Sequence, residues 1–226
     1  MSFIDNIINE FDIALKTLSN KKSGTSRGYP AEESPENLTQ EEKDLSIQLM
    51  RVNLAGEVAA QALYRGQAMV CEDDEVKEHL INAGLEETDH LIWCKKRLDE
   101  LGGNGSLLNP IWYAGSFALG AIFGSLGKQT SLGFVEETEK QVVKHLEKHL
   151  EKISQEDKKT IKILETMRAD EDQHANEASE SGGEELKDYT KRFMSMTAKV
   201  MTSTSCLLYT SPSPRDRTRS RMPSSA

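Results

Sequence analysis

The sequence predicts an all-α fold: a four-helix bundle with an extra apolar crossover helix and a C-terminal helix. Apolar residues recur at i, i+3 and i+4 steps along several long segments, which is the period of a helix that buries one face. The pattern Glu-x-x-His occurs twice, at residues 87–90 and 171–174, each time about 30 residues after another glutamate. No segment shows the two-residue period of a half-buried strand.

The spacing between the glutamates is expected to place them level on neighbouring helices. A helix rises ~1.5 Å per residue, so about 13 residues up, a short turn and about 13 residues back return the chain to the same height. Glu57 is therefore expected beside Glu87, and Glu139 beside Glu171. Within each Glu-x-x-His the two side chains share one helix face, so both can reach the same ion.

The candidate ligands fall on the apolar stripes of their helices, where a charged side chain needs a partner. One stripe reads Leu164, Met167, Glu171, His174 and Ala178, and another reads Val135, Glu139, Val142, Leu146 and Leu150. The stripe around Glu57 is the most polar of the four. The candidate metal ligands are Glu57, Glu87, His90, Glu139, Glu171 and His174. Four carboxylates and two imidazoles that project inward are the inventory of a ferritin-like di-iron bundle.

Carboxylates and imidazoles without a thiolate suit iron or manganese better than zinc, which usually takes four ligands. Six ligands for two ions leave open positions where O₂ can bind. Spacing alone does not separate storage, electron transfer and oxygen activation. The alternatives to an enzyme are a ferritin-like iron-storage or metal-binding protein without an organic substrate and a purely structural bundle. The latter leaves the inward-facing charges unexplained.

Composition bounds the remaining function classes. A chain of 226 residues suits one domain with a full core. Its net charge of -9 argues against binding nucleic acid. Three scattered cysteines form no disulfide framework and fit a reducing compartment. The N-terminus lacks the basic region and cleavage site of a secretory signal, so no export is expected.

Four segments are expected along the chain. Residues 1–18 form an amphipathic helix that packs on the bundle or lies at a membrane surface. Residues 19–38 are rich in Gly, Pro and Ser, which predicts a mobile linker. Residues 39–205 form the bundle domain. Residues 206–226 carry four arginines against one aspartate and three prolines, which predicts a disordered or foreign tail, with a basic interaction tail as the alternative.

Within the bundle domain, capping signals set the expected helix ends. Thr39 and Glu42 form a capping box that starts a helix running to about residue 70. Asp73 or Asp74 caps the next helix, which stops at Gly102 near residue 101. Further helices are expected at about 131–153, 155–179 and 184–203.

Residues 101–127 carry no charge, and Pro110 predicts a helix over 110–126. A bilayer-spanning helix needs ~20 apolar residues, so this one is short for that role. A second interpretation is a buried crossover that joins two helical hairpins. A third is a helix that packs on the bundle and shows an apolar face to the membrane surface or to a lipidic substrate.

From about Leu45 to Ser205 the chain resembles the demethoxyubiquinone hydroxylases of ubiquinone biosynthesis. The resemblance is carried by the runs Arg51–Gly66, Glu86–Leu91, Asn109–Phe117, Gly133–Glu139 and Asp170–Ala175. The first run and the uncharged Asn-Pro-x-Trp-Tyr-Ala-Gly-Ser-Phe run are far more specific than Glu-x-x-His alone. The chain departs at Asn53-Leu54, where many members have a histidine before Ala-Gly-Glu.

The resemblance implies a ferritin-like bundle with two iron ions, held by the same six residues that the spacing selects. It implies O₂-dependent hydroxylation of the ring of a demethoxyubiquinol, with a reduced nicotinamide as electron source. By position it places His145 near the site, as a second-shell candidate, with a surface histidine as the alternative. Tyr64 is a candidate for the substrate pocket, with ordinary packing as the alternative. It also implies a polyprenyl quinol substrate, a lipid-binding partner in a ubiquinone-synthesis complex and a peripheral location on the cytoplasmic face of the cell membrane.

Overall fold

A computed structural model describes residues 3–19, 21, 23–31 and 36–205, so the expected tail at 206–226 lies outside the described residues. These residues contain helices and no strand, as the sequence predicted. The helices are α1 (Phe3–Leu18), α2 (Gln40–Val70), α3 (Asp74–Leu101), α4 (Asn109–Gly124), α5 (Lys128–Lys152), α6 (Lys158–Glu180) and α7 (Asp188–Ser205).

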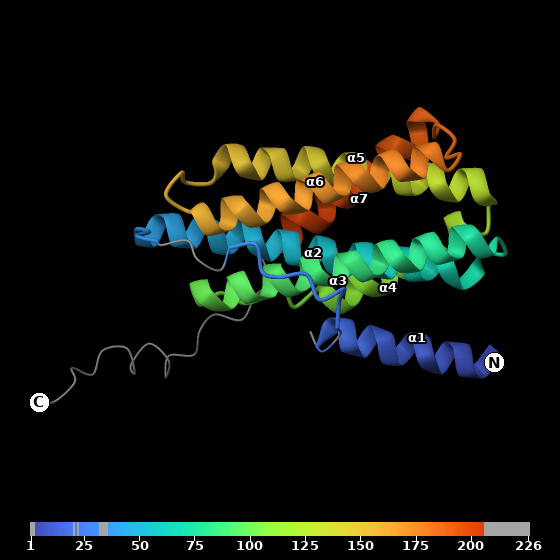
Figure 1. Cartoon of the computed structure of the whole chain (residues 1–226), viewed down its shortest axis with the longest axis horizontal. Coiled ribbons are helices and arrows are strands. Elements are labelled where there is room, and N and C mark those ends of the chain that lie inside the picture. The colour runs from blue at the N-terminus through green and yellow to red at the C-terminus, as the bar shows by residue number, and fades with distance from the viewer. Residues whose placement is uncertain (1–2, 20, 22, 32–35, 206–226) are drawn as a thin grey trace, which may run out of the picture.

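Two helical hairpins form the bundle (Figure 1). Helix α2 packs along α3, α5 packs along α6, and α3 contacts α6 between the hairpins. Their apolar faces meet in one core, to which all four helices contribute. Its buried members include Met50, Leu54, Leu91, Leu98, Leu146, Ile163, Leu164 and Met167. The four-helix bundle is therefore confirmed, with α4 against α2, α1 at the outer side of α4, and α7 beside α2 and α5.

Capping side chains fix the ends of the first hairpin. The Thr39 hydroxyl accepts from the Glu42 backbone N–H at 3.3 Å, and the Glu42 carboxylate accepts from the Thr39 N–H at 2.8 Å. This confirms the predicted capping box. Asp73, rather than Asp74, caps α3 by accepting from the backbone N–H of Val76. Gly102 ends α3 with a φ of 75°, a left-handed conformation that favours glycine.

Two helices begin later than the sequence predicted. Helix α6 begins at residue 158 rather than 155, because the Asp157 carboxylate accepts from the Thr160 N–H at 2.9 Å and caps the helix there. Helix α7 begins at residue 188 rather than 184. The Glu184 N–H donates to the carbonyl of Gln129 on α5 at 3.0 Å. This contact holds the backbone at residue 184 against α5 in a non-helical conformation.

Helix α4 lies so close to α2 that only glycine fits at the contact. A Cβ on Gly120 would stand 2.1 Å from the Leu63 carbonyl oxygen, and one on Gly66 would stand 2.1 Å from the Phe117 carbonyl oxygen. The opposite side of α4 leaves apolar side chains such as Ile122 exposed. This agrees with a helix that packs on the bundle and shows an apolar face. None of the described helices is long and apolar enough to cross a membrane.

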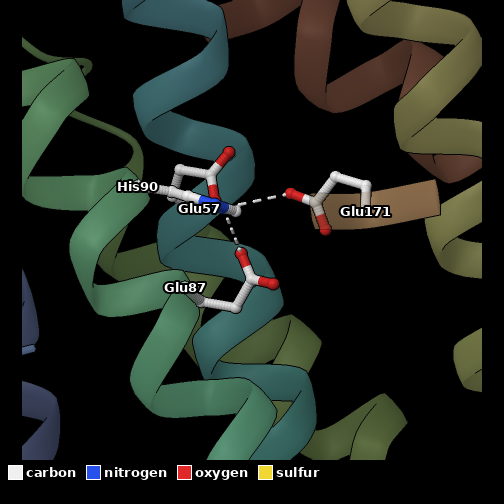
Figure 2. A group of neighbouring side chains, drawn as sticks. All are labelled: Glu57, Glu87, His90 and Glu171. Carbon is white, nitrogen blue, oxygen red and sulfur yellow. Dashed lines mark hydrogen bonds and ion pairs between the residues drawn. The ribbon is translucent and has the colours of Figure 1, made fainter. Parts of the chain in front are cut away.

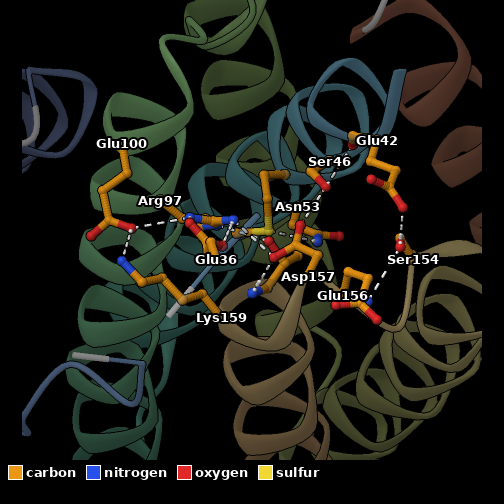
Figure 3. A network of polar contacts seen from close by, with 12 residues as sticks. Glu36, Glu42, Ser46, Asn53, Arg97, Glu100, Ser154, Glu156, Asp157 and Lys159 are labelled. Carbon is orange, nitrogen blue, oxygen red and sulfur yellow. Dashed lines mark hydrogen bonds and ion pairs between the residues drawn. The ribbon is translucent and has the colours of Figure 1, made fainter. Parts of the chain in front are cut away.

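A network around buried Arg97 closes one end of the bundle (Figure 3). Its guanidinium donates to the Asp157 carboxylate at 2.8 Å and to the Thr160 hydroxyl at 2.9 Å, which joins α3 to α6. It also donates to Glu36 at 3.0 Å and to Glu100 at 3.1 Å. A buried arginine needs such partners to offset its lost hydration. The network therefore fixes residue 36 on the bundle just before α2.

Residues 23–31, which we call the strap, have no regular secondary structure and run along α3 (Figure 1). The Thr25 N–H donates to the Asp89 carboxylate at 3.1 Å, and Arg27 pairs with Asp170 at 2.7 Å. Ala31, at the end of the strap, is buried in the main core. Composition predicted a mobile linker over 19–38. The specific contacts of this segment with α3 and α6 are a feature that composition does not reveal.

Candidate metal centre

All six predicted ligands are buried in the interior of the bundle, each with at most 3% of its surface exposed. They come from all four bundle helices: one each from α2 and α5, and one Glu-x-x-His pair each from α3 and α6. They are Glu57, Glu87, His90, Glu139, Glu171 and His174. Helices of similar length in two hairpins bring these positions to one level, as the 30-residue spacing predicted.

Four of the six converge tightly (Figure 2). One ligand atom from each of Glu57, Glu87, His90 and Glu171 lies within 4.8 Å of the other three. The Nδ1 atom of His90 is at their centre. It lies 3.2 Å from Oε1 of Glu171, 3.3 Å from Oε2 of Glu87 and 3.7 Å from Oε2 of Glu57.

His174 faces the other oxygens of two of the same carboxylates. Its Nδ1 atom lies 3.3 Å from Oε1 of Glu87 and 3.4 Å from Oε2 of Glu171. Glu87 and Glu171 therefore each direct one oxygen to His90 and the other to His174. A carboxylate with one oxygen on each side is the geometry that a ligand bridging two ions requires.

Glu139 lies outside the tight group of four, but it shares their surroundings. Its Oε1 atom accepts a hydrogen bond from the Tyr64 hydroxyl at 2.6 Å. Burial, followed by the charges of Glu171 and Glu87, raises the pKa of Glu139 well above its usual range. Glu139 also lines the same cavity as Glu57 and Glu171.

The outer nitrogen of each histidine meets an acid from the other motif. His90 Nε2 lies 2.9 Å from Asp170, which precedes Glu171, and His174 Nε2 lies 3.2 Å from Glu86, which precedes Glu87. A carboxylate at this position fixes the tautomer and ring orientation of a metal-binding histidine. Sequence reasoning missed these two residues. The signal was present, because an acidic residue directly precedes the glutamate of both motifs.

The charges of the centre are strongly coupled. Burial raises the pKa of Glu57 well above its usual range. Burial is also the largest single influence on Glu87, but the charges and contacts of His90 and His174 together outweigh it and lower the pKa of Glu87 well below its usual range. For His90, burial is outweighed by the carboxylates, Glu87 foremost, so its pKa is raised well above the usual value. Protonated imidazoles therefore offset the negative charge of the buried carboxylates, and bound cations can do the same.

Several polar atoms at the centre make ion-pair contacts with neighbouring ligands but no hydrogen bond of good geometry among the residues that the structure describes. They are Glu57 Oε2, Glu87 Oε1, Glu171 Oε2 and His174 Nδ1. Buried polar atoms in folded proteins are nearly always satisfied, so such a group calls for an explanation. All four are ligand atoms for iron or manganese, and no thiolate is among them. The residues present therefore fit a pair of such ions.

A cavity of about 470 Å³ reaches the centre from the outside, between α2, α4, α5 and α7. Three candidate ligands, Glu57, Glu139 and Glu171, stand at its wall. The rest of the wall is largely apolar and includes Val52, Ala60, Leu63, Leu119, Phe134 and Val142. His145 lines this cavity, whereas Tyr64 is not among its lining residues and instead contacts Glu139.

Comparison with known proteins gives consistent matches. The sequence model of the family "Ubiquinone biosynthesis protein COQ7" matches residues 44–205. The chain is 50% identical over 207 residues to the 3-demethoxyubiquinol 3-hydroxylase of Legionella pneumophila strain Paris, covering 90% of this chain and 97% of that protein. It is 49% identical to the enzyme of the same name from Nitrosococcus oceani, covering 90% and 96%.

A solved structure shares the fold alone. A dodecameric thioferritin, the bacterioferritin-related protein from Bacteroides fragilis, superposes with a TM-score of 0.52 at 18% sequence identity. The match covers 70% of this chain and 90% of that chain. It supports the ferritin-like bundle that the spacing of the acidic residues predicted.

Proposed function

Because the chain belongs to the family of the ubiquinone biosynthesis protein COQ7, we propose that it hydroxylates the ring of a demethoxyubiquinol at a di-iron carboxylate centre. The observation that carries the proposal is the shared wall of the cavity. The largely apolar cavity, which can hold a quinol ring, is lined at its inner end by three buried carboxylates of the candidate metal centre.

The six buried residues would hold the two ions. Glu87 and Glu171 are placed to bridge, because each faces both histidines. Glu57 lies on the His90 side, and Glu139 completes the set of acids. A bound pair of iron ions would supply the chemistry that reduces O₂ for a ring hydroxylation, and O₂ is the proposed co-substrate. A reduced nicotinamide as the electron source also remains a proposal, based on the family resemblance.

The cavity suits a quinol in size and in polarity. Its volume of about 470 Å³ falls within the ~300–1,000 Å³ of small-molecule sites. His145 lies on this mostly apolar wall, and its buried Nε2 atom has no hydrogen-bond partner among the described residues. Burial lowers the pKa of His145 to about 4, so the ring is neutral at pH 7. A neutral imidazole can accept the hydrogen of a quinol hydroxyl, and we assign this role to His145.

Exposed apolar side chains suggest where the substrate arrives. Phe11 and Leu15 on α1 are 65% and 52% exposed, and Ile111 and Ile122 on the adjacent α4 are 60% and 55% exposed. Apolar side chains on one side of amphipathic helices favour the boundary of a lipid bilayer. We therefore propose peripheral association with the cytoplasmic face of the cell membrane, where a polyprenyl quinol is available. A lipid-binding protein that presents the quinol is a proposed partner of the same surface.

A single reconstitution tests the proposed function against iron storage. The purified protein is given Fe(II), a reductant, O₂ and a short-chain demethoxyquinol, and the quinol is analysed by mass spectrometry. The proposed function predicts a product heavier by one oxygen atom, labelled when ¹⁸O₂ is used. Iron uptake without a hydroxylated ring would support the storage alternative. Failure to bind iron at all would leave only a structural bundle.

A further inference from the structure

The strap places an arginine directly outside the candidate metal centre. The Arg27 guanidinium makes a bidentate contact with the Asp170 carboxylate. Its Nη1 atom lies 2.7 Å from Oδ2, and its Nη2 atom donates to Oδ1 at 3.1 Å. The same Oδ2 atom lies 2.9 Å from Nε2 of His90. Arg27 thus reaches a predicted metal ligand through one intervening side chain.

Arg27 also contacts Trp93, whose ring lies beside the His90 imidazole. Its guanidinium carbon stands 5.0 Å above the centre of the Trp93 ring, within the range of a cation–π interaction. The Trp93 ring is buried, and its centre lies 5.3 Å from the centre of the His90 ring. The two groups that flank the outer side of His90 therefore both rest against one arginine.

The strap is fixed on both sides of Arg27. Before it, Gly24 lies so close to α3 that a Cβ would stand 2.0 Å from Oδ1 of Asp89, and the Thr25 N–H donates to the other oxygen of that carboxylate. After it, the Tyr29 ring lies against the core with the Lys96 ammonium 3.9 Å from the ring centre. The position of Arg27 is thus determined by several independent contacts.

We propose that Arg27 is a positioning residue for the His90 side of the metal centre. It holds Asp170 so that this carboxylate keeps the Nε2–H of His90 directed outward, which leaves the Nδ1 lone pair directed at the carboxylates and their ion. The inference rests on the proposed function, because it takes His90 as a ligand. It adds a residue from outside the bundle, 143 positions from Asp170 in the sequence.

The two sides of the centre differ in this respect. Glu86, the acid on His174, has no comparable arginine among the salt bridges of the described residues, and its side chain is 40% exposed. The Asp170 side chain is only 16% exposed. Arg27 makes its direct contact with Asp170 and acts on Glu86 only through its charge. Loss of Arg27 should therefore weaken the ion site beside His90 more than the site beside His174, whereas general damage to the bundle would weaken both equally.

The test measures metal binding, without turnover. Co(II), whose absorption reports its ligands, is titrated into the metal-free wild type, Arg27→Ala, Arg27→Lys and the control Arg168→Ala, which removes an exposed arginine of α6. We expect two Co(II) ions per chain in the wild type and control. In Arg27→Ala one of the two should bind at least ~10-fold more weakly, with an altered spectrum, as for other outer-sphere partners. Arg27→Lys should fail to restore it, because an ammonium cannot form the two-pronged contact.

A double-mutant cycle with Asp170→Asn separates a positioning role from a structural one. If Arg27 acts through Asp170, adding Arg27→Ala to Asp170→Asn should cause no further loss of Co(II) affinity. Losses that add, full rescue by lysine, or wild-type affinity in Arg27→Ala would each overturn the proposal. If Arg27→Ala does not fold, Arg27→Lys takes its place in the same cycle with Asp170→Asn. A wild type that binds no pair of ions would instead overturn the proposed function.

Discussion

The Tyr64 hydroxyl on α2 donates to Oε1 of Glu139 on α5 over 2.6 Å, and both side chains are buried. This hydrogen bond joins the two hairpins at the level of the metal centre. Burial raises the pKa of Glu139 well above its usual range, so without a metal the carboxyl keeps its proton to a higher pH than an exposed glutamate does. With a cation bound, the carboxylate is charged and the hydrogen bond from Tyr64 becomes stronger.

Tyr64→Phe should therefore cost more in the iron-loaded protein than in the metal-free one. We expect a loss of about 1 kcal/mol in the free energy of unfolding without metal, and about 1.5–3 kcal/mol with it, because hydrogen bonds to charged groups contribute more. Calorimetry of both forms measures the difference. Tyr29→Phe is the matched control, since its hydroxyl donates to Glu100 at 3.3 Å at the surface. Equal losses with and without metal would contradict this prediction.

Glu139→Gln should stabilise the metal-free protein as the pH rises. The raised pKa means that the folded state keeps a proton that the unfolded state releases above pH 4.5, so the wild type loses stability above that pH. Glutamine is neutral and removes this loss. The urea midpoint of Glu139→Gln should exceed that of the wild type by more at pH 8 than at pH 5. Glu165→Gln, at an exposed site of α6, should show no such trend.

The bridging geometry predicts unequal effects of the acidic ligands. Glu87→Gln or Glu171→Gln should disrupt both ion positions, because each carboxylate faces both histidines. Glu57→Gln should disrupt mainly the position beside His90. Iron per chain, measured by elemental analysis after desalting, should fall further in the first two variants than in the third. Identical iron contents in all three would rule out the assigned roles.

The contact between α2 and α4 predicts a strong effect of one methyl group. Gly120→Ala should lower the free energy of unfolding by about 1–3 kcal/mol, because the new Cβ would meet the Leu63 backbone, which cannot rotate away. Gly115→Ala on the same helix meets nothing within 4 Å and should be neutral or stabilising by up to about 1 kcal/mol. Urea unfolding compares the two. Equal stability would show that α4 does not press on α2 in solution.

Much of the bundle follows from short-range patterns in the sequence. The Thr39 capping box, the Gly102 helix end and the inward phase of Glu139 and Glu171 all depend on residues within a few positions of one another. The 30-residue spacing also predicted that Glu57 lies beside Glu87, because the lengths of two antiparallel helices determine which of their positions are at the same height. These features needed no knowledge of tertiary contacts.

What the sequence did not reveal depends on contacts between distant segments. The start of α7 follows from the hydrogen bond of Glu184 to Gln129, which no local signal encodes. The roles of Asp170 and Arg27 need the relative height of α3, α6 and the strap. Residues around Arg27 lack helical periodicity, so composition alone predicted a linker there.

The most direct test of the metal centre is a crystal structure of the iron-loaded protein with data collected on both sides of the iron absorption edge. Two anomalous peaks are expected in the bundle interior, one beside Nδ1 of His90 and the other beside Nδ1 of His174, with Glu87 and Glu171 reaching both. A single peak, or iron bound away from these side chains, would contradict the central claim.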